Sequence, residues 1–190
     1  MVKEASTPVS ERVLHGLVGT GLLCQDPALR TAPNTISVRS PAFAPGAALP
    51  SRYTAAGAGV SPPLCWHGVP PGAASVVLLV EGADSPASAP LVHALVTGLP
   101  PADGLLAAGV LGDETGCAQL SGIGLNSLLQ RRWLAPQAPS AQGPQRCGFQ
   151  VFALDHVPAL GEVPARPALR AAIAGHVLAR GLLMATFERP

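Results

Sequence analysis

The chain has 190 residues and a net charge of +1 at pH 7; 48% of its residues are hydrophobic and only 12% are charged. This length favours one domain with a single core, and the charged fraction is well below the roughly 25% typical of soluble domains. The near-neutral charge and the 4% aromatic content exclude the basic surface and the stacking platform of a nucleic-acid-binding protein.

The four cysteines are dispersed along the chain, with no pair at CxxC spacing. We interpret them as reduced thiols of a cytoplasmic protein rather than as a disulfide framework. The early charged residues Lys3 and Glu4 argue against a secretory signal. No apolar run reaches the ~18 residues of a membrane span, so no integral membrane segment is expected.

The first predicted element is an amphipathic helix over residues 8–19. Thr7-Pro8 is a typical helix start, and the valines and leucines that follow recur at helical spacing. Residues 1–35 are therefore predicted to form this helix and a linker, and residues 36–190 to form the domain itself. The apolar face of the helix and the weakly charged surface predict a homodimer, in which a second subunit covers them.

From residue 36 onward, short apolar runs between Pro/Gly turns predict a mostly β domain with peripheral helices. The predicted strands are Ser37–Phe43, Val76–Glu81, His93–Leu99, Phe149–Asp155 and Met184–Glu188. The continuous apolar run at 76–81 is typical of a strand buried on both faces. A second helix of about four turns is predicted from Leu169 to Arg180. The Gly/Pro-rich stretch between Pro100 and Arg146 is predicted to be a long loop that is functional or disordered.

An acidic segment with Glu81 and Asp84 comes directly after the buried strand, where side chains emerge at a strand end. The alternative is a solvated turn. His93 opens the next strand nine residues later and can return to the same end of the sheet. It is either a packed core residue or part of a site, in which the imidazole donates a hydrogen bond and, when protonated, carries positive charge. Together, Asp84 and His93 would bind a polar or anionic headgroup.

Arg146 and Cys147 lead into the strand at 149–155. Arg146 either contacts a phosphate or holds its loop through carbonyls and a carboxylate. Cys147 is either a small buried hydrophobe or, beside His93, an activated thiol. The thiol reading lacks a third group to orient the histidine.

Taken in order, the motifs of the chain resemble those of the phosphatidylethanolamine-binding protein family, in its bacterial Raf-kinase-inhibitor-like branch. They are SPAF at 40–43, LP at 49–50 with YT at 53–54, SPPL-x-W at 61–66, VVLLVEGADSP at 76–86 followed by His93, G-x-N at 124–126, WLAPQAP at 133–139, GPQRCGF at 143–149 followed by FALD, and a closing GHVLA helix with TFER. The resemblance covers about residues 36–189. It implies a β-sandwich-like fold with peripheral helices, and a related bacterial branch also has an N-terminal helix.

Members of this family have a small pocket for phosphate, phosphoethanolamine headgroups or similar anions, and the resemblance implies a pocket at the matching positions. These positions are Gly82, Asp84, Pro86, His93, Pro139, Gln145 and Cys147, with Arg146 beside them. The pattern is only partly preserved, because Gly82 replaces an Asp, Gln145 a His and Cys147 a Tyr. Each lost polar contact weakens ligand binding by ~1–3 kcal/mol, and the changes make the pocket larger and less polar.

We therefore expect a small pocket for an anionic or phospholipid-headgroup-like ligand, partly degenerate, so that the ligand can differ from that of the family. The alternative is a protein-interaction module of the kinase-inhibitor-like type without a strong ligand. A weak hydrolase that uses Cys147 or His93 is a further alternative. No catalytic residue, metal site or cofactor is predicted.

Overall fold

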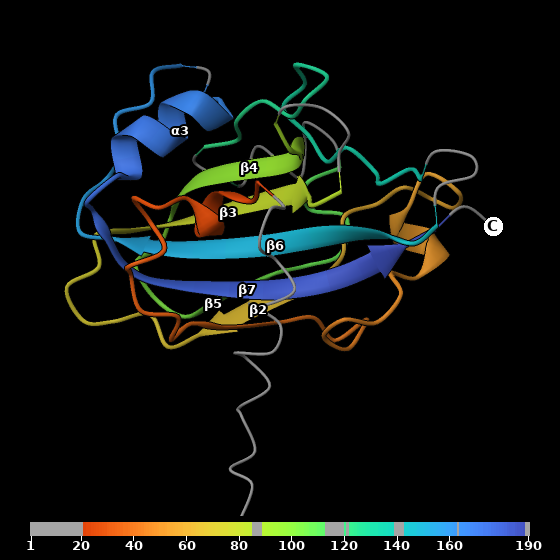
Figure 1. Ribbon diagram of the computed structural model, residues 1–190, viewed down its shortest axis with the longest axis horizontal. Helices are drawn as coiled ribbons and strands as arrows, with labels where there is room; N and C mark the ends of the chain where they lie inside the picture. Colours follow the sequence, from red (N-terminus) through yellow and green to blue (C-terminus); the bar gives the residue numbers. More distant parts are fainter. Residues whose placement is uncertain are drawn as a thin grey trace, which may run out of the picture.

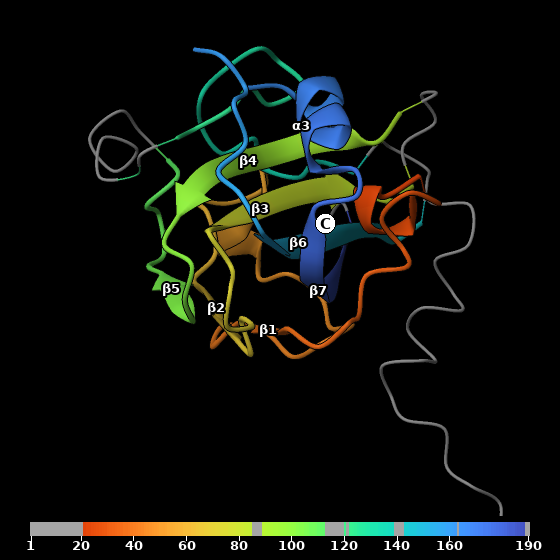
Figure 2. The same ribbon diagram turned by 90° about the vertical axis from the view of Figure 1, so that its left-hand side faces the viewer.

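The structure is a computed structural model that describes residues 21–84, 89–112, 120, 122–138, 143–162 and 164–188. Figure 1 and Figure 2 show two antiparallel sheets. The first sheet has the order β1 (Ser37–Arg39), β2 (Leu64–His67), β5 (Gly104–Leu106), and the second the order β4 (Leu91–Leu99), β3 (Ser75–Gly82), β6 (Gln145–Leu154), β7 (Val177–Phe187). The predicted mostly β, sandwich-like fold is confirmed. The helix predicted over residues 8–19 lies outside the described residues.

Strand β3 lies inside the four-stranded sheet, between β4 and β6. All eight of its residues are buried, which confirms the prediction of a strand covered on both faces. Because side chains alternate along a strand, Val76, Leu78 and Val80 enter the core between the two sheets, whereas Val77 and Leu79 enter a second core on the outer face. Full burial of each such side chain contributes about 1.5–3 kcal/mol.

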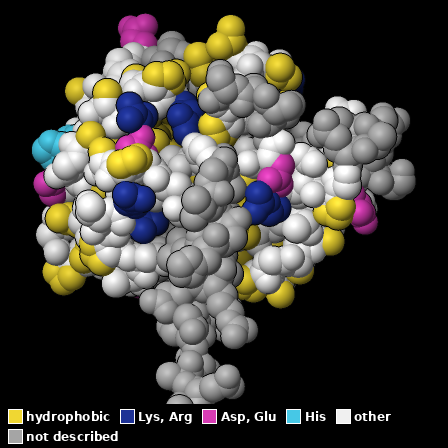
Figure 3. Space-filling view, in the orientation of Figure 1, with side chains coloured by type: hydrophobic (Ala, Val, Ile, Leu, Met, Phe, Trp, Pro, Cys, Tyr) yellow, Lys and Arg dark blue, Asp and Glu magenta, His cyan; other side chains and the backbone are white. Residues whose placement is uncertain are grey.

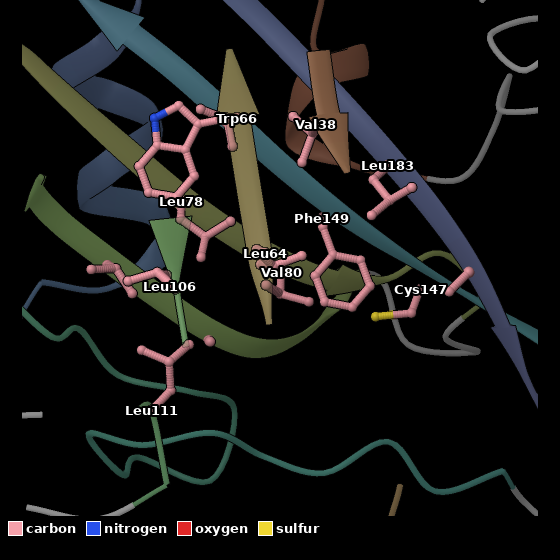
Figure 4. Close-up of a cluster of buried hydrophobic side chains, with 14 of the residues drawn as sticks. Val38, Leu64, Trp66, Leu78, Val80, Leu106, Leu111, Cys147, Phe149 and Leu183 are labelled. Carbon is pink, nitrogen blue, oxygen red and sulfur yellow. The ribbon is translucent and has the colours of Figure 1, made fainter. Parts of the chain in front are cut away.

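The core between the sheets is shown in Figure 4. Cys147 and Phe149 project into it from β6, in the same buried cluster as Leu64 and Trp66 of β2. Nε1 of Trp66 donates a hydrogen bond to the carbonyl oxygen of Ala102 at 3.1 Å, so this indole is satisfied inside the core. The beginning of β6 is therefore part of the core.

The outer face of the four-stranded sheet is covered by helix α3 (Arg166–Ile173) and by the segment that contains the short 3-10 helix η1 (Leu23–Gln25), as Figure 2 shows. Both elements contribute buried apolar side chains to the second core: Leu22, Leu23, Leu29, Leu169 and Ile173. The second core thus joins the N-terminal part of the described chain to the crossover between β6 and β7.

A buried polar network holds the η1 segment on this face. Glu81 is fully buried, and its Oε2 accepts hydrogen bonds from the backbone N–H of Leu23 at 2.8 Å and from Nε2 of Gln150 at 2.6 Å. Its Oε1 accepts from Nε of Arg166. Glu81 therefore lies on the opposite face of β3 from the core between the sheets and serves the second core, so the prediction that it emerges with Asp84 at the strand end is wrong.

The C-terminal helix is shorter than predicted. α3 ends at Ile173, and Gly175 has a φ of +82°, a left-handed conformation that favours glycine and ends helices. Val177 already pairs with Leu154 of β6, and Arg180 with Phe152. The prediction of helix through GHVLA to Arg180 is therefore wrong, and the last strand begins at Val177 rather than at Met184.

Strands β2 and β5 were not among the predicted elements, because each has only three or four residues and lies between Pro/Gly turns. β5 falls within the stretch that the sequence predicted as a long loop. Among the described residues, the single α-helix α3 has eight residues, so none of the described helices is long and apolar enough to cross a membrane.

Candidate functional site

The ends of β3, β4 and β6 meet at one edge of the four-stranded sheet. Gly82, at the end of β3, pairs with Leu91 of β4 on one side and with Cys147 of β6 on the other. The backbone N–H of Ala83 then donates to the carbonyl of Arg146 at 2.8 Å. This pairing brings the predicted residues Gly82, Asp84, His93, Arg146 and Cys147 to the same end of the sheet.

Asp84 and Arg146 form a closed ion pair at this edge. Oδ2 of Asp84 accepts from the backbone N–H of Arg146 at 2.7 Å and from its Nε at 3.0 Å, and Oδ1 accepts from Nη2 at 2.5 Å. These hydrogen bonds from Arg146 hold the pKa of the Asp84 carboxyl below its usual value, and those to Asp84 raise the pKa of Arg146. Both carboxylate oxygens accept hydrogen bonds, so the Asp84 carboxylate is ionised and the guanidinium of Arg146 balances its charge.

His93 is buried and presents a lone pair rather than a proton on its outer nitrogen. Its Nδ1 donates to the carbonyl oxygen of Leu134 at 2.7 Å, and the backbone N–H of Leu134 donates back to the carbonyl of His93. Burial lowers the pKa of His93 to about 4, so the imidazole is neutral at pH 7. Its Nε2 is shielded from solvent and has no hydrogen-bond partner among the described residues.

Nε2 of His93 points toward the position that Gly82 leaves without a side chain. A Cβ added at Gly82 would lie 3.4 Å from this nitrogen, which is an ordinary van der Waals distance. The Asp that the family pattern has at this position would therefore stand next to the imidazole. In this chain the glycine removes that acidic partner and leaves the His93 nitrogen unpaired.

Aromatic rings surround His93. The ring of Trp133 has its centroid 5.9 Å away, and that of Phe187 lies edge-on at 6.3 Å. Trp133 is stacked 6.3 Å from Phe149, and its own Nε1 is a second buried polar atom without a partner among the described residues. Trp133 and Phe187 were not predicted as site residues, although each belongs to a motif of the family resemblance, WLAPQAP and TFER.

The remaining predicted positions differ from one another. Cys147 is fully buried, and burial raises the pKa of its thiol far above the usual value, with the negative charge of Glu81 adding to the effect. The side-chain amide of Gln145 donates to the carbonyl of Gly143 at 3.3 Å. Pro86 and Pro139 lie outside the described residues. A protonated thiol in the core does not suit the hydrolase alternative, because the thiolate is the nucleophile.

We expect thiol reagents to modify Cys65 but not Cys147 in the native protein. Cys65 is partly exposed, whereas Cys24 and Cys147 are buried, and burial also raises the pKa of Cys24 to about 11. Peptide mapping by mass spectrometry after a short iodoacetamide treatment measures this, with urea-unfolded protein as the control in which all four cysteines of the chain react. Rapid labelling of native Cys147 would contradict a buried, inert thiol.

Charged side chains are sparse on the face of the molecule seen in Figure 3, and acidic and basic groups lie next to each other among uncharged and hydrophobic ones. The pairing of Asp84 with Arg146 follows the same pattern, since it leaves little net charge at the sheet edge.

Comparison with known proteins assigns the chain to a family. The sequence profile described as phosphatidylethanolamine-binding protein matches residues 39–188. The chain belongs to the phosphatidylethanolamine-binding protein family. A UPF0098 protein of Chlamydia trachomatis is 34% identical over 159 residues, which cover 81% of this chain and 99% of the relative. A UPF0098 protein of Mycobacterium tuberculosis is 35% identical over 156 residues, covering 82% of this chain and 71% of the relative.

Two solved structures show the same fold. The crystal structure of a phosphatidylethanolamine-binding protein homolog from Chlamydia trachomatis has a TM-score of 0.72 and 34% identity, and the match covers 83% of this chain and 99% of the homolog. Escherichia coli YbcL has a TM-score of 0.73 at 20% identity, covering 82% of this chain and 99% of YbcL, which supports the fold alone. The family member described here therefore has the phosphatidylethanolamine-binding protein architecture, with His93 and Gly82 at one sheet edge.

Proposed function

We propose that this family member binds a small oxyacid, a ligand that has both an O–H group and an acceptor oxygen, at the edge formed by β3, β4 and β6. The observation that supports the proposal is the unpartnered Nε2 of His93, a polar atom that is buried inside an aromatic cluster. A buried polar atom without a partner costs about 1–3 kcal/mol. A ligand that supplies the missing hydrogen bond recovers this free energy when it binds.

The protonation state of His93 restricts the ligand. The neutral imidazole accepts a hydrogen bond at Nε2, and Nε1 of Trp133 donates one, so a matching ligand has an O–H group and an acceptor oxygen. Monoprotonated phosphate esters and carboxylic acids have both. A ligand without a proton would require His93 to be protonated, which at pH 7 costs about 4 kcal/mol for a pKa of about 4.

The ion pair and the glycine restrict the ligand further. Because Asp84 is neutralised by Arg146, it neither repels an anion nor attracts a cationic amine strongly. Because Gly82 replaces the family's Asp, no acidic side chain at that position competes for Nε2 of His93. Both features favour an uncharged or singly charged oxyacid over the doubly charged phosphate, in agreement with a pocket that is less polar than the family pattern.

Calorimetric titration of the full chain with inorganic phosphate, phosphoethanolamine and acetate, from pH 5 to pH 8, tests the proposal. We expect saturable binding that strengthens toward pH 5, where the phosphate groups of the first two ligands are singly charged and more of the acetate is protonated. The absence of saturable binding for all three would contradict the proposal and favour the protein-interaction alternative. Homodimerisation and a cytoplasmic location stay predictions.

Replacing Trp133 with Phe is expected to weaken ligand binding by about 5- to 150-fold, because one hydrogen bond worth ~1–3 kcal/mol is lost. Trp66→Phe is a matched control, since the Nε1 of Trp66 is already bonded to Ala102. Both variants leave a similar void, but only Trp66→Phe breaks a hydrogen bond of the unliganded protein. It should therefore lower the free energy of unfolding more than Trp133→Phe, by about 1 kcal/mol, without changing affinity. If Trp66→Phe weakens ligand binding and Trp133→Phe does not, Trp133 does not contact the ligand.

Replacing Gly82 with Asp is expected to raise the pKa of His93 well above 4. The Cβ of the new residue fits beside Nε2 of His93, and a carboxylate there favours the imidazolium. NMR titration of the imidazole C–H signals measures the pKa. Gly82→Asn has the same size without the charge and should leave it near 4. An equal rise in both variants would exclude a charge effect.

A further inference from the structure

Two imidazoles and a carboxylate lie close together at the far end of the sheet from the proposed ligand site. Asp155 and His156 directly follow β6, and His176 directly precedes β7. The ligand site lies near the first residues of β6, so the length of this ten-residue strand, about 30 Å at ~3.3 Å per residue, separates the two places. The three side chains therefore have no part in the proposed function.

The donor atoms of this cluster converge on one point. Nδ1 of His176 lies 2.9 Å and Nδ1 of His156 lies 3.1 Å from the same oxygen, Oδ1 of Asp155. The centroids of the two imidazole rings are 4.4 Å apart. One ligand atom from each residue lies within 4.8 Å of the other two. Such a convergence of two nitrogens and one oxygen is the first requirement for a metal site.

Hydrogen bonds to the main chain hold all three residues in position. The N–H of Asp155 donates to the carbonyl of His176 at 3.2 Å, and the hydroxyl of Ser75 donates to the carbonyl of His156 at 2.6 Å. The N–H of His176 donates to the carbonyl of Ile173, the last residue of α3, at 3.0 Å. The side chains themselves are exposed or half-buried, so small rotations can adjust them while the backbone stays fixed.

The geometry and the donor types suit a transition metal. Zinc binds imidazole nitrogen and carboxylate oxygen at about 2.0–2.2 Å, which places the ligand atoms of a tetrahedral site roughly 3.4 Å apart. The separations of 2.9 and 3.1 Å are close to this value. Imidazole ligands favour zinc, copper and nickel, whereas magnesium and calcium require mostly oxygen ligands. Because the cluster faces solvent, water can complete the coordination.

We propose that Asp155, His156 and His176 bind one divalent transition-metal ion, and that the bound ion clips together the two ends of the chain segment that carries α3. Residues 155 and 176 bracket this segment. α3 covers the second core with Leu169 and Ile173. An ion that holds Asp155 and His156 to His176 therefore keeps this cover in place, and it stabilises the folded protein because the unfolded chain lacks the preformed site.

Zinc titration of the full chain, purified without a histidine tag, tests the proposal by calorimetry. We expect saturable binding of one ion per chain. His156→Ala and His176→Ala should each weaken this binding by ~10–100-fold or more, because loss of a group that only hydrogen-bonds to a metal ligand already has an effect of that size. His67→Ala is the matched control, because His67 faces Asp103 at 3.5 Å as an exposed pair that has no third metal-ligating group among the described residues. The control should bind zinc as tightly as the wild type.

Two further measurements separate the metal site from a change in folding. The continuous-wave electron paramagnetic resonance spectrum of bound Cu²⁺ should show hyperfine coupling to two imidazole nitrogens in the wild type and to one in either variant. The circular dichroism spectrum should stay unchanged. Zinc should raise the Tm of the wild type but not that of His176→Ala. The proposal is overturned if zinc does not bind saturably, or if neither histidine variant weakens its binding. Zinc binding without a rise in Tm would overturn the claim that the ion holds the two ends of the α3 segment together.

Discussion

Replacing Glu81 with Gln is expected to lower the free energy of unfolding by about 3–5 kcal/mol, as breaking one side of a buried ion pair does. The side chain of Glu81 is fully buried, and that of its partner Arg166 is only 18% exposed. All three contacts of the carboxylate are with donors: the backbone N–H of Leu23, Nε2 of Gln150 and Nε of Arg166. An amide has one acceptor oxygen in place of two, so at least one of these donors is left unpaired.

Gln150 cannot rotate to relieve the mismatch. Its Oε1 accepts from the backbone N–H of Cys24 at 2.7 Å, which fixes its NH₂ group toward residue 81. The substitution therefore also weakens the attachment of the η1 segment. Urea unfolding at pH 7 measures the loss. Asp26→Asn is the matched control, since the side chain of its partner Arg170 is 56% exposed, and an ion pair that is open to solvent on one side contributes less than a buried one. If the two variants lose equal stability, the Glu81 network is not a stabilising feature.

Stability is expected to fall by roughly 3 kcal/mol between pH 6.5 and pH 4 because of His93. The folded-state pKa of about 4 lies below the ordinary value of 6.5, since burial disfavours the imidazolium. As the pH falls through 6.5, the unfolded chain binds a proton that the folded protein does not, so unfolding becomes easier. The loss of stability is complete near pH 4. The folded and unfolded pKa values differ by about 2.5, and each pKa unit corresponds to ~1.36 kcal/mol of free energy of unfolding.

Urea unfolding at pH 7.0 and pH 4.5, together with NMR titration of His93, measures this effect. The carboxyls of Asp26 and Asp84 do not produce it, because their pKa values are held below 3.8 by hydrogen bonds from arginines, and they titrate at lower pH. A bound oxyacid ligand that donates to Nε2 should lower the pKa of His93 further, because the hydrogen bond engages the lone pair that the imidazolium would lose. A His93 pKa near 6.5 in the folded protein would contradict both the buried lone pair and the ligand chemistry built on it.

The strands that carry the site were predictable, because their signal is local. Eight consecutive buried residues in β3 require a continuous apolar run, and Gly175 marks the end of α3 wherever the chain goes next. The prediction of helix beyond Gly175 was wrong, because residues 177–180 have apolar spacing that fits a helix equally well. Their pairing with the end of β6, a contact between distant residues, overrides that local pattern.

The family, the mostly β fold and the convergence of Gly82, Asp84, His93 and Cys147 followed from the order of motifs along the chain. The roles of these residues did not, because each depends on which face of a strand a side chain occupies and on what lies opposite. Only the tertiary structure engages Asp84 with Arg146, turns Glu81 into the second core and leaves Nε2 of His93 buried without a partner. The same holds for Asp155, His156 and His176, which the β6–β7 pairing brings together across 20 residues of sequence. Burial and pairing over such separations determine protonation and free hydrogen-bonding capacity, and these decide what the site can bind.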